Sequence, residues 1–484
     1  MRTINKIFII LLSTIFFVSC NSDLLETAPV TSFSDLTVFD NVGRVEQQVN
    51  GLYGSVKNGN FLGGRNYVYH DIRCENFLNE TANNVTGFSV WNHTVQPSNQ
   101  NDVTNLWNTA YLAINRINVF LVGLDNNADK LKAQGVTDAT LNGFRAEARF
   151  LRGLSYFSLL QLYASPYADG NGAKLGVPLQ LNANVASGDN NLERATVAKV
   201  YEVIVEDLNF ADNNLPATRA TNTRVAKNAA IALKTRVFLH QGRYADVVTE
   251  ANKIVSQSAP FESPIGAKHA LSPSVADVFK TPYAHVERIF NFPFTDLDLP
   301  GTQNGLGSYY NPGPRGIGDY FLNPNGIIKD SVNWVVKDER RAFIFANTNN
   351  KLYWNKFSTG PLHVDHVPVI RYAEVLLNLS EAIARTAGND ARALALLNAV
   401  RTRSKGTAYN AFSSANDLIE AILVERQIEF LGEGFRGIDQ QRLLRPLPGK
   451  SNVTAIQSTS PAYLWPIPAG ELLVNKLCVQ NPGY

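Results

Sequence analysis

The chain has few cysteines, few charged side chains and only one long apolar run. Cys20, Cys74 and Cys478 are the only cysteines among 484 residues, which excludes a disulfide-rich framework and a cysteine-based metal motif. Cys74 and Cys478 can form one bridge or remain free, and the sequence does not choose between the two. Beyond the first twenty residues, no apolar stretch approaches the length that a membrane-spanning helix needs.

Charge of either sign is also scarce. Charged residues are 18% of the chain, below the usual roughly 25%. Without the two basic residues of the N-terminal segment 1–19, Lys plus Arg and Asp plus Glu balance at 42 each. Because attraction to phosphate backbones needs net positive charge, we expect no nucleic-acid partner. Asparagine is abundant instead, which suits a surface that hydrogen-bonds neutral polar ligands.

Motifs of nucleophilic, phosphate-binding and zinc-hydrolase chemistry are absent as well. The chain has no Gly-x-Ser-x-Gly elbow, no phosphate-cradling loop and no zincin motif. His363, Asp365 and His366 are the only tight group of possible metal ligands, and no further ligand stands at a recognisable spacing. We therefore expect neither a metal site nor a cofactor.

The first twenty residues have the features of a secretory signal. Two basic residues precede an apolar stretch over residues 7–18, which is followed by Ser19 and Cys20. A cysteine directly after a small residue is the lipid-accepting position of bacterial lipoproteins, although the leucine usual three residues before it is missing. We expect 1–19 to be the signal, Cys20 to carry lipid and 20–35 to form a tether. The alternative is an ordinary signal cleaved nearby.

The periodicity of apolar residues predicts a mainly α-helical fold. Apolar side chains recur at three- and four-residue steps over 103–121 and 141–163, and the second helix should end before Pro166. Another helix should start at Thr196 and stop before Pro216. The length alone suggests about three domains, but no disordered linker separates them. One large helical body is the better prediction.

Two segments have the pattern of tetratricopeptide-like helical hairpins. Between residues 226 and 255, small and apolar residues line two helices that Gly242-Arg243-Tyr244 separates. Residues 371–403 repeat this design around Gly388-Asn389. Such pairs usually build scaffolds rather than catalytic centres.

Two loop-like stretches, 58–101 and 258–368, are rich in asparagine, glycine, proline and aromatic residues, and hold short strands at most. An exposed aromatic ring covers the C–H face of a sugar, whereas amide, carboxylate and guanidinium groups bond its hydroxyls. Our hypothesis is a ligand platform from these loops, made of Trp91, Asn92, Tyr309, Tyr310 and Trp334, with Arg73 and Asn66 as polar candidates. The alternative is that any of these residues is a buried loop anchor.

Charged residues on the predicted helices are interpreted as ion pairs. Glu425 and Glu429 lie one turn apart, as an acid/base pair would, but Arg426, Arg436 and Arg442 are close in sequence. We therefore expect ion pairs that tie helices together. The same interpretation covers Arg149, Arg152, Arg371 and Glu374.

Six sequence blocks follow one another along most of the chain. They occupy residues 146–179 (AEARFLR and GVPL), 371–382 (RYAEVLLN), 397–403 (LN and RTR), 425–439 (ERQIE and GEG), 465–468 (WPIP) and 480–484 (QNPGY). In this order, and behind a lipoprotein signal, they make the chain resemble the SusD/RagB family of Bacteroidetes outer-membrane nutrient-binding lipoproteins.

The resemblance implies a SusD-like, mainly α fold with tetratricopeptide-like hairpins and a loop-built ligand surface. It divides the chain into an N-terminal helical part, 36–257, and a RagB/SusD C-terminal part, 258–484, which includes the loop-rich insert 258–368. It further implies a lipid-anchored, surface-exposed protein of the outer membrane. Such a protein binds a nutrient, here an oligo- or polysaccharide, and delivers it to a SusC-like TonB-dependent transporter without enzymatic activity.

Two alternatives to a glycan carrier stay open. One keeps the family role with a peptide as cargo. The other is a surface glycoside hydrolase, whose active site needs two carboxylates beside a sugar cleft, with Asp296 and Asp298 as isolated candidates.

Overall fold

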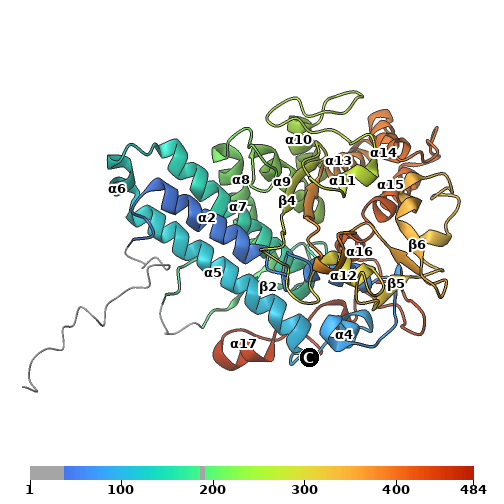
Figure 1. Ribbon diagram of the computed structural model, residues 1–484, viewed down its shortest axis with the longest axis horizontal. Coiled ribbons are helices and arrows are strands. Elements are labelled where there is room, and N and C mark those ends of the chain that lie inside the picture. The colour runs from blue at the N-terminus through green and yellow to red at the C-terminus, as the bar shows by residue number, and fades with distance from the viewer. Residues whose placement is uncertain (1–36, 186–190) are drawn as a thin grey trace, which may run out of the picture.

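The computed structural model describes residues 37–185 and 191–484. The expected signal 1–19, the lipid-accepting Cys20 and the tether 20–35 therefore lie outside the described residues. Helices dominate the described part (Figure 1), as the periodicity predicts. None of these helices combines the length and apolarity required for a membrane span.

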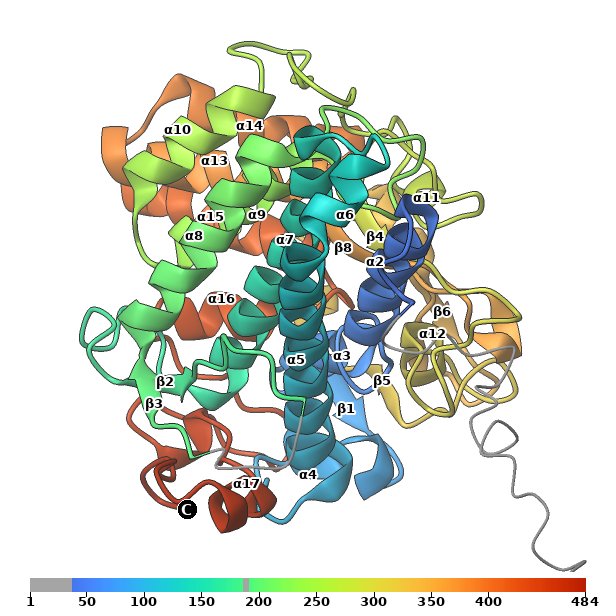
Figure 2. The ribbon, with the colours of Figure 1, turned by 90° about the vertical axis from the view of Figure 1, so that its left-hand side faces the viewer.

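Long helices form the N-terminal half and pack side by side (Figures 1 and 2). They are α2 (Val42–Val56), α5 (Asn105–Asn126), α7 (Asp138–Tyr163) and α8 (Val197–Asn214). α7 is buried along most of its length because it contacts the other three. The hydroxyls of Thr137 and Thr196 accept the backbone N–H groups of Thr140 and Lys199, each at 3.2 Å, and so cap α7 and α8.

Two helical hairpins form, as predicted, and they stack on each other. The first is α9 (Lys227–His240) with α10 (Tyr244–Ile254), and the second is α13 (Tyr372–Ala387) with α14 (Ala391–Arg403). α10 packs against α13. Gly242 and Gly388 make the turns with φ of 69° and 79°, which glycine adopts without strain.

The remaining helices, most of them short, complete the helical part. They are α3 (Arg65–Ile72), α4 (Phe88–Trp91), α6 (Ala128–Ala133), α11 (Val275–Val278), α12 (Leu306–Tyr310), α15 (Ala415–Glu429), α16 (Phe435–Arg442) and α17 (Ala469–Val474). A π-helical segment, Gln100–Thr104, leads into α5.

The strands are short and pair in antiparallel twos. The pairs are β1 (Phe77–Asn79) with β5 (Tyr320–Leu322), β2 (Leu175–Pro178) with β3 (Arg194–Thr196), β4 (Arg288–Phe292) with β8 (Val367–Arg371), and β6 (Ile344–Ala346) with β7 (Leu352–Trp354). The segment 258–368 thus holds short strands, as expected from its many prolines and glycines.

One hydrophobic core includes residues from both halves of the chain. In it, the ring of Tyr163 lies 4.9 Å from that of Trp107 and 5.7 Å from that of Trp465, which joins the C-terminal segment to α5 and α7. The boundary at residues 257 and 258 stays a prediction. Cys74 and Cys478 are both buried and free.

Candidate functional site

The structure buries the aromatic residues of the hypothesised platform. Tyr309, Tyr310 and Trp334 have no exposed area, and Trp91 is 6% exposed. A ring that stacks on a sugar needs an open face. The burial therefore argues against a platform made of these rings and favours the alternative, that they are loop anchors.

Their contacts explain the burial. The indole N–H of Trp91 donates to the carbonyl of Phe77 at 2.9 Å, and the hydroxyl of Tyr310 donates to Asp71 Oδ2 at 3.3 Å. Trp334 packs edge-on against Trp354 at 6.1 Å. Each contact fixes a loop to a neighbouring element.

The polar candidates have structural surroundings as well. Arg73 is 1% exposed and donates to the carbonyl of Tyr463 at 2.6 Å. Asn66, 5% exposed, lines a small internal hollow. Asn92 is half-buried and follows α4 as its C-terminal cap residue.

A row of three aromatic side chains lies near the strand pairs, and its two outer rings are more open to solvent than its middle one, Tyr353, which is 3% exposed. We call Phe321, Tyr353 and Phe345 the aromatic strip. The ring of Tyr353 lies 6.3 Å from that of Phe321 and 6.0 Å from that of Phe345. Both phenylalanines are partly exposed. The strip thus presents two partly open phenylalanine rings that a buried tyrosine joins.

Strand alternation builds this strip. In β7, Tyr353 pairs with the partly exposed Phe345 of β6 and is 3% exposed, and the next residue, Trp354, is 1% exposed. In β5, Phe321 lies between two buried residues, Tyr320 and Leu322. β5 packs beside β7, so the rings of Phe321 and Phe345 both contact Tyr353.

Charged and amide groups border the strip at both ends. The Lys351 ammonium lies 5.0 Å from the centre of the Phe321 ring and forms an ion pair with Glu80. The Arg315 guanidinium lies 5.7 Å from the centre of the Phe345 ring and donates to Asn355 Oδ1 at 3.1 Å. Hydrogen-bonding groups therefore stand beside apolar rings, as recognition of a polyhydroxylated ligand requires.

A polar hollow of about 340 Å³ lies in the asparagine-rich loop that the sequence indicated. Amide, hydroxyl and carboxylate side chains line it: Asn84, Ser89, Thr94, Asn99, Gln100, Asn101 and Asp102. The loop before it is fixed to β5, because Thr81 and Thr86 donate to Asp319, the residue preceding that strand. The hollow and the strip thus share a support at β5.

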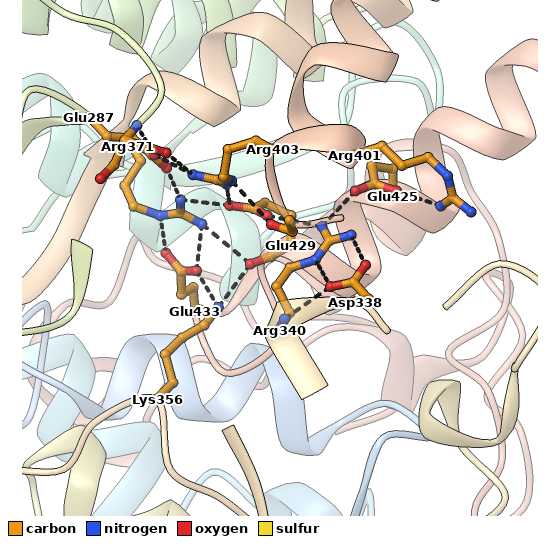
Figure 3. A network of polar contacts seen from close by, with 12 residues as sticks. Glu287, Asp338, Arg340, Lys356, Arg371, Arg401, Arg403, Glu425, Glu429 and Glu433 are labelled. Carbon is orange, nitrogen blue, oxygen red and sulfur yellow. Dashed lines mark hydrogen bonds and ion pairs between the residues drawn. The ribbon is translucent and has the colours of Figure 1, made fainter. Parts of the chain in front are cut away.

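Beneath the β6–β7 pair lies a buried network of ion pairs (Figure 3). It consists of Glu287, Asp338, Arg340, Lys356, Arg371, Arg401, Arg403, Glu425, Glu429 and Glu433. Five positive and five negative groups balance. Glu429 lies at the centre and accepts from Arg371 at 2.8 Å, from Arg403 at 2.7 Å and from Arg340 at 3.0 Å.

The electrostatics of the network favour its charged form. Burial opposes ionisation of Glu429, but the guanidinium groups of Arg403, Arg371 and Arg340 outweigh it and hold the pKa of this carboxyl well below its usual range. A carboxylate that several cations hold ionised accepts hydrogen bonds and is unsuited to donating a proton. This supports the interpretation of the helical charges as structural ion pairs.

The remaining predicted ion pairs form too, in part with other partners than expected. Arg149 and Arg152 pair with Asp207 at 2.7 and 2.8 Å, and Glu374 pairs with Arg236 at 2.6 Å. The three arginines expected near Glu425 and Glu429 pair elsewhere: Arg426 with Asp439, Arg436 with Glu75, and Arg442 with Asp439 and Glu381. Sequence proximity predicted the ion pairing of these charges but not their partners.

The network holds one end of the β6–β7 pair, the end at which β6 begins and β7 ends. Arg340 lies in the 3₁₀ turn Glu339–Phe343 directly before β6, and Lys356 follows β7 by two residues. Arg340 pairs with Glu425 and Glu429, and Lys356 pairs with Glu433 at 2.7 Å. The strands that carry two rings of the strip are thus tied to α15 and the turn that follows it.

Other candidate chemistry finds little support within the described residues. No group of three His, Cys, Asp or Glu side chains there is arranged to hold a metal ion. Asp365 instead accepts the N–H groups of Ser358 and Thr359, at 2.9 and 3.2 Å. Of the two carboxylates considered for hydrolysis, Asp298 forms an ion pair with Lys57, and Asp296 is exposed on the same loop.

Comparisons with known proteins give this architecture a family. A family model described as "Starch-binding associating with outer membrane" matches residues 24–239, and one described as "SusD family" matches residues 348–484. The crystal structure of a SusD superfamily protein from Bacteroides fragilis is 31% identical, with a TM-score of 0.79 over 91% of this chain and 99% of that chain. The chain belongs to the SusD family.

Two further relatives agree. SusD-like protein P2 of Formosa agariphila is 24% identical over 540 residues, which cover 99% of each chain. The structure of a laminarin-binding SusD-like protein is 21% identical, with a TM-score of 0.71 over 92% of this chain and all of that chain. The last likeness shows the shared fold.

The SusD-like sequence blocks coincide with the ion network rather than with the strip. Arg371, Arg401 and Arg403 come from the second and third blocks, and Glu425, Glu429 and Glu433 from the fourth. The strip residues lie between blocks. The sequence signal that could have found them is the alternation of outward and buried residues in the short strands, which requires knowing the strand pairs.

Proposed function

We propose that this SusD-family protein binds an oligo- or polysaccharide on the aromatic strip and carries out no catalysis. The observation that supports the proposal most directly is the pair of partly exposed rings, Phe321 and Phe345, which lie on either side of the buried Tyr353 and are bordered by amide and charged groups. Two open rings, each about 6 Å from the Tyr353 ring that separates them, suit different sugar units of one chain.

The polar hollow extends the proposed surface. Its neutral amides and hydroxyls can bond sugar hydroxyl groups, and its anchoring loop is fixed to β5 beside the strip. Among relatives, one SusD-like protein with this fold binds laminarin. A polysaccharide is therefore the proposed ligand class, with a peptide as the alternative cargo.

The rest of the proposed role follows from the family and the N-terminal sequence. We propose that Cys20 carries lipid, that the protein lies on the cell surface at the outer membrane, and that it passes its ligand to a SusC-like TonB-dependent transporter. Weak contacts to several sugar units suffice in this setting, because a tethered receptor and a multivalent ligand increase the effective affinity.

Calorimetry with a panel of soluble glycans and oligopeptides tests the binding proposal. Phe321→Ala and Phe345→Ala remove partly exposed rings, and each should weaken glycan binding about tenfold, because one stacked ring is worth about 1–1.5 kcal/mol. Phe412→Ala is the matched control, since Phe412 is also partly exposed but lies outside the strip. Wild-type affinity in both strip variants would remove the strip from the binding site.

A second measurement tests the absence of catalysis. The protein is incubated with each glycan that it binds, and new reducing ends are assayed over time. A rise that Asp298→Asn abolishes would establish the hydrolase alternative. We expect no rise above the protein-free control.

A further inference from the structure

A cavity of about 480 Å³ lies at the C-terminal end of the chain. We call it the C-terminal cavity. It is formed by the loop after α7, by β3 and by two C-terminal segments, and its lining includes Pro166, Arg194, Ser460, Pro461 and Gln480. Its volume falls in the range of small-molecule sites, about 300–1,000 Å³. In Figure 2, β3 and the chain end lie on the side opposite to β6, so this cavity is separate from the aromatic strip.

Arg194 is the distinctive residue of this lining. It is 6% exposed. Its guanidinium donates to four backbone carbonyls: Gly176 at 2.7 Å, Val479 at 3.1 Å, Leu175 at 3.2 Å and Tyr163 at 3.3 Å. Within the described residues, no carboxylate forms an ion pair with it, in contrast to the arginines of the buried network.

This environment leaves a positive charge without a counter-ion. Burial lowers the pKa of Arg194, which shows that the carbonyl partners compensate only part of the desolvation. A guanidinium has five N–H donors, and four contacts leave one on Nη1 unused. An anion in the cavity would supply the missing charge.

The other polar groups of the cavity limit what this anion can be. Lys174 and Asp169 both line the cavity, but they pair with each other at 2.6 Å and add no net charge. Hydroxyl groups of Ser458, Thr459 and Ser460 stand beside prolines. Such a lining suits a ligand with one negative group, an apolar face and hydroxyls.

We propose that the C-terminal cavity binds a small organic carboxylate, such as an acidic monosaccharide, with its carboxylate directed to Arg194. The site is independent of the strip and does not rest on the proposed glycan function.

Equilibrium binding of sodium glucuronate tests the proposal, with glucose at the same ionic strength as the neutral analogue and a separate series for glucuronate in which sodium chloride is varied. Glucuronate should bind at least tenfold more tightly than glucose, and its affinity should fall as sodium chloride is raised, because the contact is ionic. Equal affinity for both sugars, or full displacement by chloride at equimolar concentration, would overturn the proposal.

Two variants locate the site. Arg194→Gln removes the charge and should abolish the preference for glucuronate. Because this variant also loses carbonyl contacts and can fail to fold, Ala173→Trp provides a second test: Ala173 is an exposed lining residue, and a tryptophan there fills the cavity. Ala411→Trp, at an exposed position outside the cavity, is the control. Glucuronate binding that survives Ala173→Trp unchanged would also refute the site.

Discussion

Removing one carboxylate from the centre of the buried ion network should destabilise the whole fold. Glu429→Gln keeps the shape of the side chain but leaves the five cations facing four anions, at a position with no exposed area. Three charge-assisted hydrogen bonds lose their ionic acceptor. Breaking a buried pair from one side costs about 3–5 kcal/mol, and we expect a loss of unfolding free energy in this range.

The pH dependence gives this prediction its sharpest test. The folded-state pKa of Glu429 lies below the unfolded value of 4.5, so its ionic contribution is complete above pH 4.5 and is lost as pH falls. The difference between wild type and Glu429→Gln should therefore shrink by about 1.4 kcal/mol per pH unit below 4.5, or about 2 kcal/mol at pH 3.

Urea unfolding followed by circular dichroism at pH 7 and pH 3 measures both quantities. Asp246→Asn is the control, since Asp246 pairs with Arg243 at the surface, both side chains being more than 40% exposed, and such pairs contribute about 0–1 kcal/mol. A loss at pH 7 no larger than that of the control, or a difference that does not shrink at pH 3, would refute the assignment of Glu429 as the centre of a stabilising network.

Three further predictions concern other buried groups. Burial lowers the pKa of Lys450 to about 7 from an ordinary 10.5, so its desolvation penalty is full below pH 7 and disappears as pH rises towards 10.5. The wild type should therefore gain about 4 kcal/mol of unfolding free energy between pH 7 and 10 relative to Lys450→Met, as measured by urea unfolding. A difference between the two proteins that stays constant over this pH range would contradict the prediction. Burial raises the pKa of the Cys74 thiol to about 12, so iodoacetamide should alkylate Cys74 only after unfolding, as followed by peptide-resolved mass spectrometry. Alkylation of the native protein at the rate of a free thiol would contradict this prediction. Lys356→Met removes the ion pair that follows β7 and should speed hydrogen exchange over residues 344–354. Lys351→Met, at the edge of the strip, is the control and should not speed it. Equal exchange rates in the two variants would show that the network does not hold the strand pair.

The helical framework could be predicted because its determinants are local. Pro166 ends α7, Thr196 caps α8, and Gly242 turns the chain between α9 and α10. Each of these effects depends on a few neighbouring residues. Helix positions and both helical hairpins therefore agree with the structure.

The candidate site depends on contacts that sequence spacing does not encode. Tyr309 and Tyr310 lie in a glycine-rich segment whose composition predicts a surface loop, yet they form part of a short buried helix. Large aromatic residues anchor loops as often as they bind ligands. Phe321 and Phe345 became neighbours of Tyr353 only through the pairing of β6 with β7 and the packing of β5 beside β7. Composition selected the segment 258–368, and tertiary packing decided which of its rings are partly exposed.

The separation between the sequence blocks and the candidate site explains why the family is easy to recognise from this sequence and the ligand is not. The recognisable blocks supply Arg371, Glu429 and Glu433, whose ion pairs demand particular side chains at particular places. Through Arg340 and Lys356, these pairs hold the end of the β6–β7 pair at which β6 begins and β7 ends. A binding surface is more precise when its supporting residues are fixed in this way, and the outward side chains beside the fixed end can then vary with the ligand without affecting the fold. The specificity of this protein should therefore reside in strip and hollow residues such as Phe321 and Phe345, and not in the blocks that identify its family.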